Sequence, residues 1–202
     1  MATKSKISEL FNEIGKLEEE LEEALQTHSV RLRYELDGAK VRFEKSVADA
    51  HRQLKTGTVR WLLRSKLRNI VTAPVIYSMV IPFALLDISV SIYQLLCFPL
   101  YGIPRVDRRR YIVIDRHQLS YLNAVEKTNC LYCGYVNGLV AYVREIVGRT
   151  EQYWCPIKHA KRILDPHRHY AKFADFGNAD NLSQHSAMMR EQIRAVDENK
   201  RS

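Results

Sequence analysis

The chain has 202 residues, of which 46% are hydrophobic, and its 31 Lys and Arg against 23 Asp and Glu give a net charge of +8. An apolar share of this size is ordinary for a folded protein and excludes a disordered or collagen-like chain. Only 4 cysteines are present, which excludes a small domain held together by disulfides. The composition therefore predicts one folded domain, or one domain with an appendage.

The charged residues are distributed unevenly along the chain. From Asn69 to Pro104, Asp87 is the only charged residue in 36 positions, so the positive charge lies on the two flanks of this segment. The first residues lack the apolar core of a signal peptide, and we therefore expect the N-terminus in the cytosol. Thiols stay reduced there, so closely spaced cysteines favour metal or redox chemistry.

An apolar series with helical spacing runs from Ile7 to Leu54. Its steps average about 3.6 residues, the period of a straight α-helix rather than that of a two-stranded coiled coil. The series predicts one long amphipathic helix that ends near Gly57 and is about 70 Å long at 1.5 Å per residue. A chain of this size cannot cover such a length. We therefore expect residues 7–54 to form a homo-oligomer or to bind a helical partner protein.

The segment around Gly57 is rich in basic residues. Residues 52–68 hold six Lys or Arg and no acid, and Trp61 and several leucines are interleaved with them. This composition is typical of a short helix in the headgroup layer of an anionic lipid bilayer, although a soluble domain could carry the same helix on its surface.

The stretch from Ile70 to Ile103 is longer than the roughly 20 apolar residues that cross a hydrocarbon core. It contains Pro74, Pro82 and Pro99, and basic residues flank it on both sides. Lys and Arg mark the cytoplasmic side of a membrane, so both flanks and both termini are expected on that side. We therefore predict a membrane-embedded helical hairpin that enters one leaflet and turns near Pro82. A single span and a buried hairpin of a soluble domain are the alternatives.

Asp87 interrupts this apolar stretch. With Ser91 and Gln94 it forms one polar line on a helix, at positions i, i+4 and i+7. An aspartate within a bilayer costs roughly 2.5–3.5 kcal/mol, so Asp87 should face protein or water. It is a candidate catalytic residue, as a carboxylate that handles a proton or binds a substrate. The alternative is a structural role, in which it bonds backbone groups freed by the prolines.

The most specific chemical signal is a pair of short motifs, Cys130-x2-Cys133 and, after 21 intervening residues, Cys155-x3-His159. Two close pairs of thiolate and imidazole ligands are typical of a closed tetrahedral zinc site. The sequence therefore predicts structural zinc bound by these four residues. An iron–sulfur cluster on the same ligands is the alternative cofactor. A redox dithiol, a catalytic thiol and simple burial are further interpretations.

Three more histidines are candidates for a second metal site. His167 and His169 alternate within a turn-like segment, and together with His117 they could form an open three-histidine site. The alternative is a basic surface loop.

Together these features predict a mainly α-helical protein. Its four predicted parts are a long helix over residues 1–57, a basic helix with the apolar membrane segment over 58–104, a Cys/His domain over 105–176, and a polar C-terminal tail over 177–202 with a short helix near Ser183–Val196.

The predicted function is that of a membrane-attached, cytoplasm-facing metal-binding protein with a scaffolding or assembly role. The alternative is a membrane-bound redox protein or metalloenzyme that uses the Cys/His cluster and Asp87, so the sequence leaves open whether the protein is an enzyme. Nucleic-acid binding is disfavoured, because an anionic lipid bilayer explains the basic clusters that flank the apolar stretch equally well.

Overall fold

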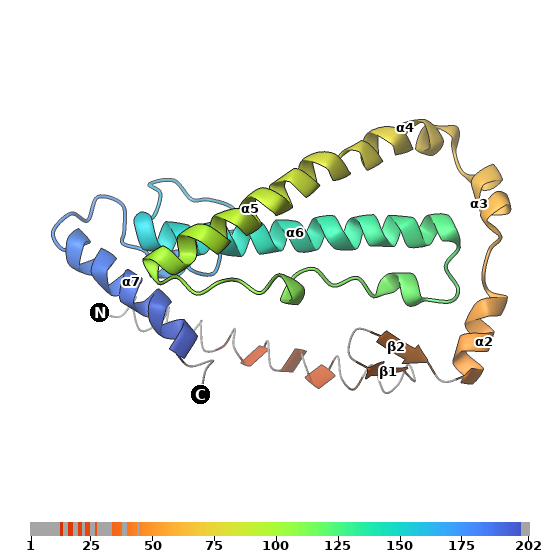
Figure 1. The fold of residues 1–202 in the computed structure, drawn as a ribbon, viewed down its shortest axis with the longest axis horizontal. Coiled ribbons are helices and arrows are strands. Elements are labelled where there is room, and N and C mark those ends of the chain that lie inside the picture. The colour runs from red at the N-terminus through yellow and green to blue at the C-terminus, as the bar shows by residue number, and fades with distance from the viewer. Residues whose placement is uncertain are drawn as a thin grey trace. The chain divides into compact units, whose positions relative to one another are not determined.

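The computed structural model describes residues 34–37, 40–43 and 45–198, and in the N-terminal part the helical positions Glu13, Lys16, Leu17, Glu20, Leu21, Glu23, Ala24 and Thr27. The chain is mainly helical (Figure 1). It divides into two compact units, which are described separately: Met1–Leu63 with Asp115–Lys127, and Arg64–Ile114 with Thr128–Ser202.

The first unit contains a β-hairpin where the sequence predicted a continuous helix. Strands β1 (Tyr34–Asp37) and β2 (Lys40–Phe43) pair antiparallel. The prediction of one unbroken helix over 7–54 is therefore wrong at the two strands, whereas residues 45–53 are helical as predicted. The reason is visible in the sequence, because apolar and polar residues alternate with a period of two on both sides of an Asp-Gly turn signal. Most of the remaining stripe, from Ile7 to Arg33, lies outside the described residues.

Helix α2 (Lys45–Gln53) follows the hairpin, and α3 (Thr58–Arg64) begins after Gly57. The ring of His51 on α2 packs edge-on against Phe43 and Tyr121, with centroids 5.3 and 5.2 Å apart. The short basic helix that the sequence predicted after Gly57 thus begins at Thr58. The 3-10 turn η2 (Arg116–Gln118) also belongs to this unit.

Helix α6 (Ala124–Trp154) begins in the first unit and runs through the second. Its start is a capping box. The Asn123 Oδ1 accepts from the backbone N–H of Glu126 at 3.0 Å, and the Glu126 carboxylate accepts from the Asn123 N–H at 2.9 Å.

The apolar segment forms α4 (Leu67–Ser78) and α5 (Val80–Tyr101), with only Met79 between them. Met79 itself has helical backbone angles, so the chain does not turn back near Pro82 (Figure 1). Pro82 is the third residue of α5, where a backbone N–H has no intrahelical partner in any case. A reversal therefore does not follow from this proline.

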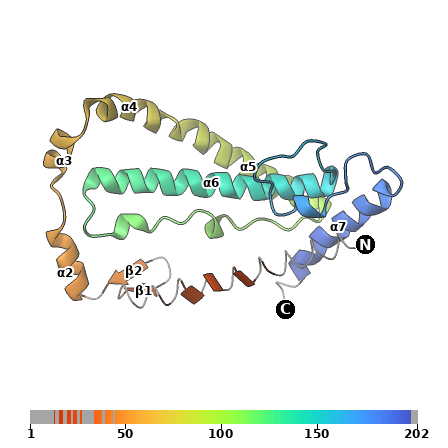
Figure 2. The ribbon, with the colours of Figure 1, turned by 180° about the vertical axis from the view of Figure 1, so that it is seen from behind.

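Helix α5 ends at Gly102, which adopts the left-handed conformation with φ of 65°. Residues 103–114 then run back alongside α5 and α6 as an extended segment that includes the 3-10 turn η1 (Arg108–Arg110) (Figures 1 and 2). Helices α5 and α6 run in the same direction. Tyr77, near the end of α4 and just before α5 begins, contacts Tyr132 of α6, and Tyr101 at the end of α5 contacts Trp154 at the end of α6, with ring centroids 5.7 and 5.1 Å apart.

The core of the second unit lies where the C-terminal half of α5, the extended segment, α6 and α7 (Leu182–Glu198) meet. Its buried members are Phe98, Ile103, Val106, Leu139, Tyr142, Ile146 and Ile193. Helix α7 confirms the C-terminal helix predicted near Ser183–Val196. The 3-10 turn η3 (Tyr170–Lys172) lies in the long loop between α6 and α7.

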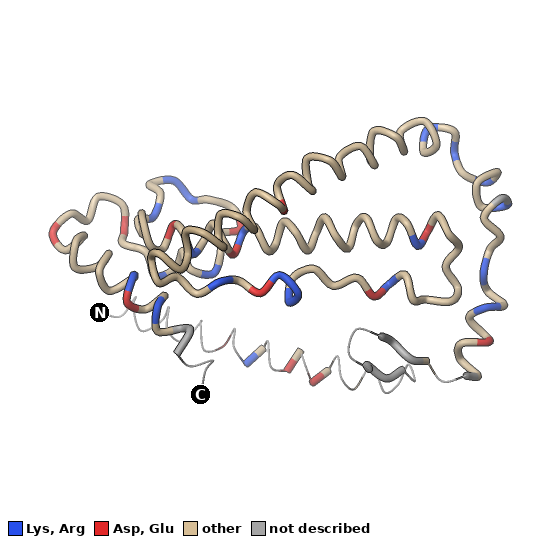
Figure 3. The backbone as a smooth tube through the Cα atoms, in the orientation of Figure 1, with Lys and Arg blue, Asp and Glu red and all other residues tan. Residues whose placement is uncertain are grey.

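Helices α4 and α5 together form a 35-residue stretch, Leu67–Tyr101, that is long and apolar enough to cross a membrane. Only 6% of its most apolar window is buried, no residue of α4 is buried, and the buried residues of α5 are Asp87, Gln94 and Phe98. Figure 3 shows how few charged residues this stretch carries compared with the rest of the second unit.

Candidate functional site

A carboxylate tie joins three segments of the second unit at Asp87. The Arg108 guanidinium, from the extended segment, donates to Oδ1 of Asp87 at 3.1 Å and to Oδ2 at 2.6 Å. The Tyr135 hydroxyl of α6 donates to Oδ2 at 3.0 Å, and the Ser91 hydroxyl of α5 donates to Oδ1 at 3.5 Å. The hydrogen bond with Asp87 raises the pKa of Arg108. Four donors thus occupy the carboxylate, which has about four lone-pair directions.

Gln94 continues the same polar line two turns further along α5. Its Oε1 accepts from the Val106 N–H at 2.9 Å, and its Nε2 donates to the Val106 carbonyl at 3.4 Å and to the Tyr142 hydroxyl. The amide thus bonds both backbone groups of one buried residue, as a neighbouring β-strand would. The polar face that the sequence predicted on this helix therefore holds the extended segment in place.

A third polar cluster surrounds Glu145 on α6. Arg149 donates to its Oε1 at 2.8 Å and also to the Pro104 carbonyl at 2.6 Å. Arg168 donates to Oε1, and Nε2 of His169 lies 3.3 Å from both carboxylate oxygens. Burial raises the pKa of Glu145, but the hydrogen bonds from these three residues outweigh it and lower the pKa from 4.5 to about 2. The carboxylate therefore stays ionised and attaches the 167–169 loop to α6.

The structure brings together two of the three histidines predicted for a second metal site. The rings of His167 and His169 lie 5.8 Å apart, and Nε2 of His167 lies 2.7 Å from the Glu151 carboxylate. His117 lies in η2, in the first unit. Among the described residues, no group of three or more His, Cys, Asp or Glu side chains is arranged to hold a metal ion. His167 and His169 instead lie against the carboxylates of Glu151 and Glu145, respectively.

The two predicted pairs of zinc ligands are far apart in the structure. Cys130 and Cys133 lie within α6, and Cys155 directly follows the last residue of that helix. A continuous helix thus separates Cys133 from Cys155, and at 1.5 Å per residue this distance is roughly 33 Å. Zinc–sulfur bonds are only about 2.3 Å long. The structure therefore does not bring the four predicted ligands around one zinc ion or one iron–sulfur cluster, because the C-x2-C motif is helical rather than a tight turn.

The remaining predicted ligand, His159, lies beyond α6 in an exposed loop. Its backbone N–H donates to the Tyr170 hydroxyl at 2.7 Å, and its Nδ1 lies 3.3 Å from the same oxygen. This side chain therefore contributes to the shape of the loop that follows α6.

The sequence reasoning missed the α6 partners in these clusters, although a signal for them exists. Tyr135, Tyr142 and Arg149 follow one another at intervals of seven residues, and so do Gly138, Glu145 and Gln152. Residues seven apart lie on the same face of a helix. The spacing therefore indicates one aromatic and polar face along α6, opposite the line that begins at Asp87.

The fold and the polar clusters define a helical protein in which an extended segment packs against two parallel helices, with an exposed apolar face on α4 and α5. No known family model, curated protein or solved structure matches this chain.

Proposed function

We propose that the protein is a membrane-attached scaffold that faces the cytoplasm and is anchored by α4 and α5. The observation that carries the proposal is the exposure of this 35-residue apolar stretch, of whose most apolar window only 6% is buried. Soluble proteins bury helices that are apolar on all sides, and a large contiguous apolar surface marks contact with lipid or with another protein. The basic residues on both flanks favour lipid.

The covered and open sides of α5 support a particular orientation in the bilayer. Its polar side lies against residues 103–114, which are not α-helical and carry the exposed side chains of Arg105, Arg109 and Arg110. A hydrocarbon core accepts neither open backbone groups nor unpaired arginines. The arrangement therefore favours a helix whose apolar face enters one leaflet while its polar face stays covered by protein. In this orientation both basic flanks remain on the cytoplasmic side.

The scaffolding part of the proposal rests on the N-terminal apolar stripe. Leu17 and Leu21 lie four residues apart at helical positions and are both exposed. This face could receive a second copy of the chain or a helical partner. Size-exclusion chromatography with light scattering should show more than one copy per particle, and Leu17→Glu with Leu21→Glu should give monomers.

Zinc or iron–sulfur binding, and catalysis by Asp87, are not part of this proposal. Most of α6 separates the thiols of Cys133 and Cys155. The Asp87 carboxylate already accepts hydrogen bonds from Arg108 and Tyr135. A carboxylate in that state fits the structural interpretation of Asp87 better than proton transfer.

Flotation with lipid vesicles tests the proposed attachment. We expect the purified protein to float with vesicles even at about 1 M salt, because apolar contact is not screened as charge contact is. Complete release into the soluble fraction at high salt would show that the attachment is only electrostatic and would contradict an apolar anchor.

A further inference from the structure

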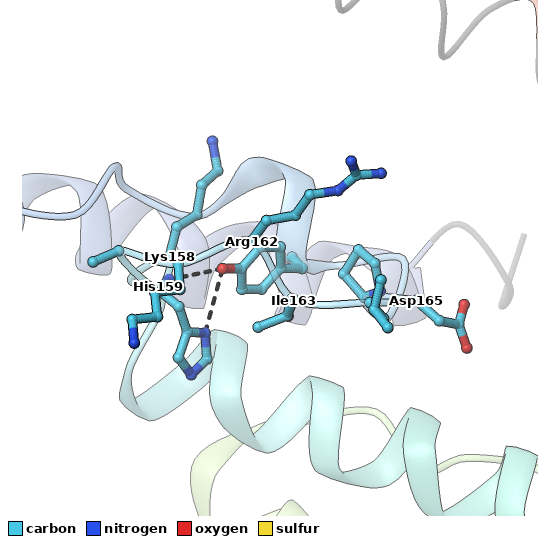
Figure 4. A pocket seen from close by; sticks show the side chains of 10 residues that line it. Lys158, His159, Arg162, Ile163 and Asp165 are labelled. Carbon is cyan, nitrogen blue, oxygen red and sulfur yellow. Dashed lines mark hydrogen bonds between the residues drawn. The ribbon is translucent and has the colours of Figure 1, made fainter.

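The loop after α6 forms an open cationic pocket (Figure 4). Residues 158–166 and Tyr170 surround a cavity of about 490 Å³. Three cations line it, Lys158, Lys161 and Arg162, against the single acid Asp165. In Figure 4, His159 and Asp165 lie at opposite ends of the loop, with Arg162 between them. Cavities of this volume are large enough for a small ligand or a lipid headgroup.

The charges of the lining leave a positive pocket. Arg144, which lies outside the lining, pairs with the Asp165 carboxylate at 3.0 Å and donates to its carbonyl at 2.6 Å. The ammonium group of Lys158 forms an ion pair with the carboxylate of Asp175, with 2.8 Å between Nζ and Oδ1. Lys161 and Arg162 have no hydrogen bond or ion pair within the part of the chain that the structure describes. These two side chains are therefore available to an anion.

The loop is held in shape before any ligand arrives. Asp165 adopts a left-handed backbone conformation, with φ of 49°, and Arg144 fixes it from α6. The Tyr170 hydroxyl accepts from the backbone N–H of His159, and the N–H of Lys158 donates to the Ala174 carbonyl at 2.8 Å. A preformed loop loses less conformational entropy on binding than a mobile one.

An exposed apolar side chain next to these cations points to a lipid. Leu164 is 88% exposed, more than any other large apolar side chain among the described residues. The loop also begins just beyond Trp154, whose exposed ring packs on Tyr101 at the C-terminal end of α5. The first residue that lines the pocket, Lys158, therefore follows this contact by only four residues. Cations adjacent to an exposed apolar residue suit the boundary between headgroups and acyl chains.

We propose that this pocket binds the phosphate of an anionic phospholipid, with Lys161 and Arg162 on the phosphate oxygens and Leu164 among the acyl chains. Arginine is well suited to this role, because its planar guanidinium can donate two parallel hydrogen bonds to a phosphate. The inference deepens the proposed membrane attachment and rests on it, since it names the class of lipid that the attached protein would select.

The test is a titration of the full-length protein, held in neutral detergent micelles, with short-chain dihexanoyl phosphatidic acid. Isothermal calorimetry should show saturable binding. The double substitution Lys161→Gln with Arg162→Gln should weaken it about 25-fold, since each cation near an anionic surface contributes about fivefold. Both positions are exposed, so the variant should keep the far-ultraviolet circular dichroism of the wild type. Unchanged affinity in this variant would overturn the proposal.

A matched control separates the pocket from general charge. Lys16→Gln with Lys172→Gln removes the same charge from exposed positions that lie outside the pocket and outside both basic flanks. We expect this control to bind phosphatidic acid within about twofold of the wild type, since neither side chain lines the cavity. An equal loss in both variants would show that overall charge decides the affinity, and it would overturn the assignment of a site.

Parallel titrations with inorganic phosphate and a short RNA distinguish the sources of the anion. Leu164→Gln should weaken binding of phosphatidic acid and leave that of inorganic phosphate unchanged. Equal affinity for inorganic phosphate and phosphatidic acid would overturn the lipid assignment. RNA that binds more tightly than phosphatidic acid, and that no longer binds the Lys161→Gln, Arg162→Gln variant, would overturn it as well. Because the micelle titration needs no bilayer, it can fail while vesicle flotation succeeds, and the reverse. The two proposals are therefore refuted by different results.

Discussion

The tie at Asp87 can be broken from one side or from both, and the two changes should have very different costs. Arg108→Met removes the two guanidinium bonds of 3.1 and 2.6 Å and leaves a mostly buried carboxylate with only the Tyr135 and Ser91 hydroxyls. Removing one partner of a buried ion pair costs about 3–5 kcal/mol. The Arg108 side chain is 45% exposed, so water screens part of the interaction and we expect the lower end, about 3 kcal/mol.

Removing both charges should restore most of the lost stability. In Asp87→Leu with Arg108→Met no carboxylate is left without its partner, and replacing a buried pair with apolar side chains is often neutral. We expect this double variant and Asp87→Leu alone each to lose about 1 kcal/mol, because the half-exposed Arg108 can be solvated by water, so the pair should show a coupling energy of about 3 kcal/mol in a double-mutant cycle.

Urea unfolding in detergent micelles, followed by circular dichroism, gives the free energy of unfolding for the wild type, both single variants and the double variant. The interpretation of Asp87 as a structural tie requires that the double variant lose less stability than the sum of the losses in the two single variants. Additive effects, or an Arg108→Met variant as stable as the wild type, would refute it.

Three further changes follow from other contacts. Alanine at Gly138 would place its Cβ 2.5 Å from a backbone oxygen of the neighbouring extended segment. Gly138→Ala should therefore lower the free energy of unfolding by about 1–3 kcal/mol in a urea titration. The control Gly57→Ala, at a position with open space around it, should leave the free energy of unfolding unchanged. The pKa of Glu145 is about 2 in the folded state, below its ordinary value of 4.5. Ionised Glu145 therefore contributes about 3 kcal/mol to the free energy of unfolding above pH 4.5, and this contribution is lost as the pH falls toward 2. In urea titrations across this pH range, Glu145→Gln should remove that part of the acid dependence. Cys133→Ser and Cys155→Ser should each change the free energy of unfolding by less than about 1 kcal/mol, and a loss near the 10 kcal/mol of a structural zinc site would contradict the separation of these thiols.

The membrane segment shows what a single sequence can establish. The near absence of charge between Asn69 and Pro104 is a property of composition, and the line through Asp87 and Gln94 follows from helical spacing, so the apolar helix and its polar face could be predicted. The reversal at Pro82 could not be settled in this way. Proline often kinks or breaks a helix in its interior but is tolerated in the first turn, and in this chain Pro74 and Pro99 lie inside α4 and α5 as well. The sequence alone therefore does not state which proline ends a helix.

The β-hairpin and the helical position of the cysteines could not be predicted for a different reason. Leu36 and Phe43 fit a helical spacing as well as an alternating one, and the longer pattern around them favoured the helix. Cys130 and Cys133 fit a metal-binding turn, but the same spacing also occurs within a helix, where nothing local distinguishes the two. The partners of Asp87 and Glu145 are distant in the sequence, so identifying them required the fold.

The most direct test of the membrane anchor places charges on the outward face of α5. Ile81 and Leu85, one helical turn apart, are 63% and 61% exposed, so aspartate at both should leave the fold intact. Each aspartate costs about 2.5–3.5 kcal/mol at the centre of a bilayer helix, and two should lower partitioning into vesicles by more than about 1,000-fold. In high-salt flotation we expect the wild type and a Met188→Asp control on α7 to float, while Ile81→Asp with Leu85→Asp stays in the soluble fraction. A double variant that floats like the wild type would contradict the account.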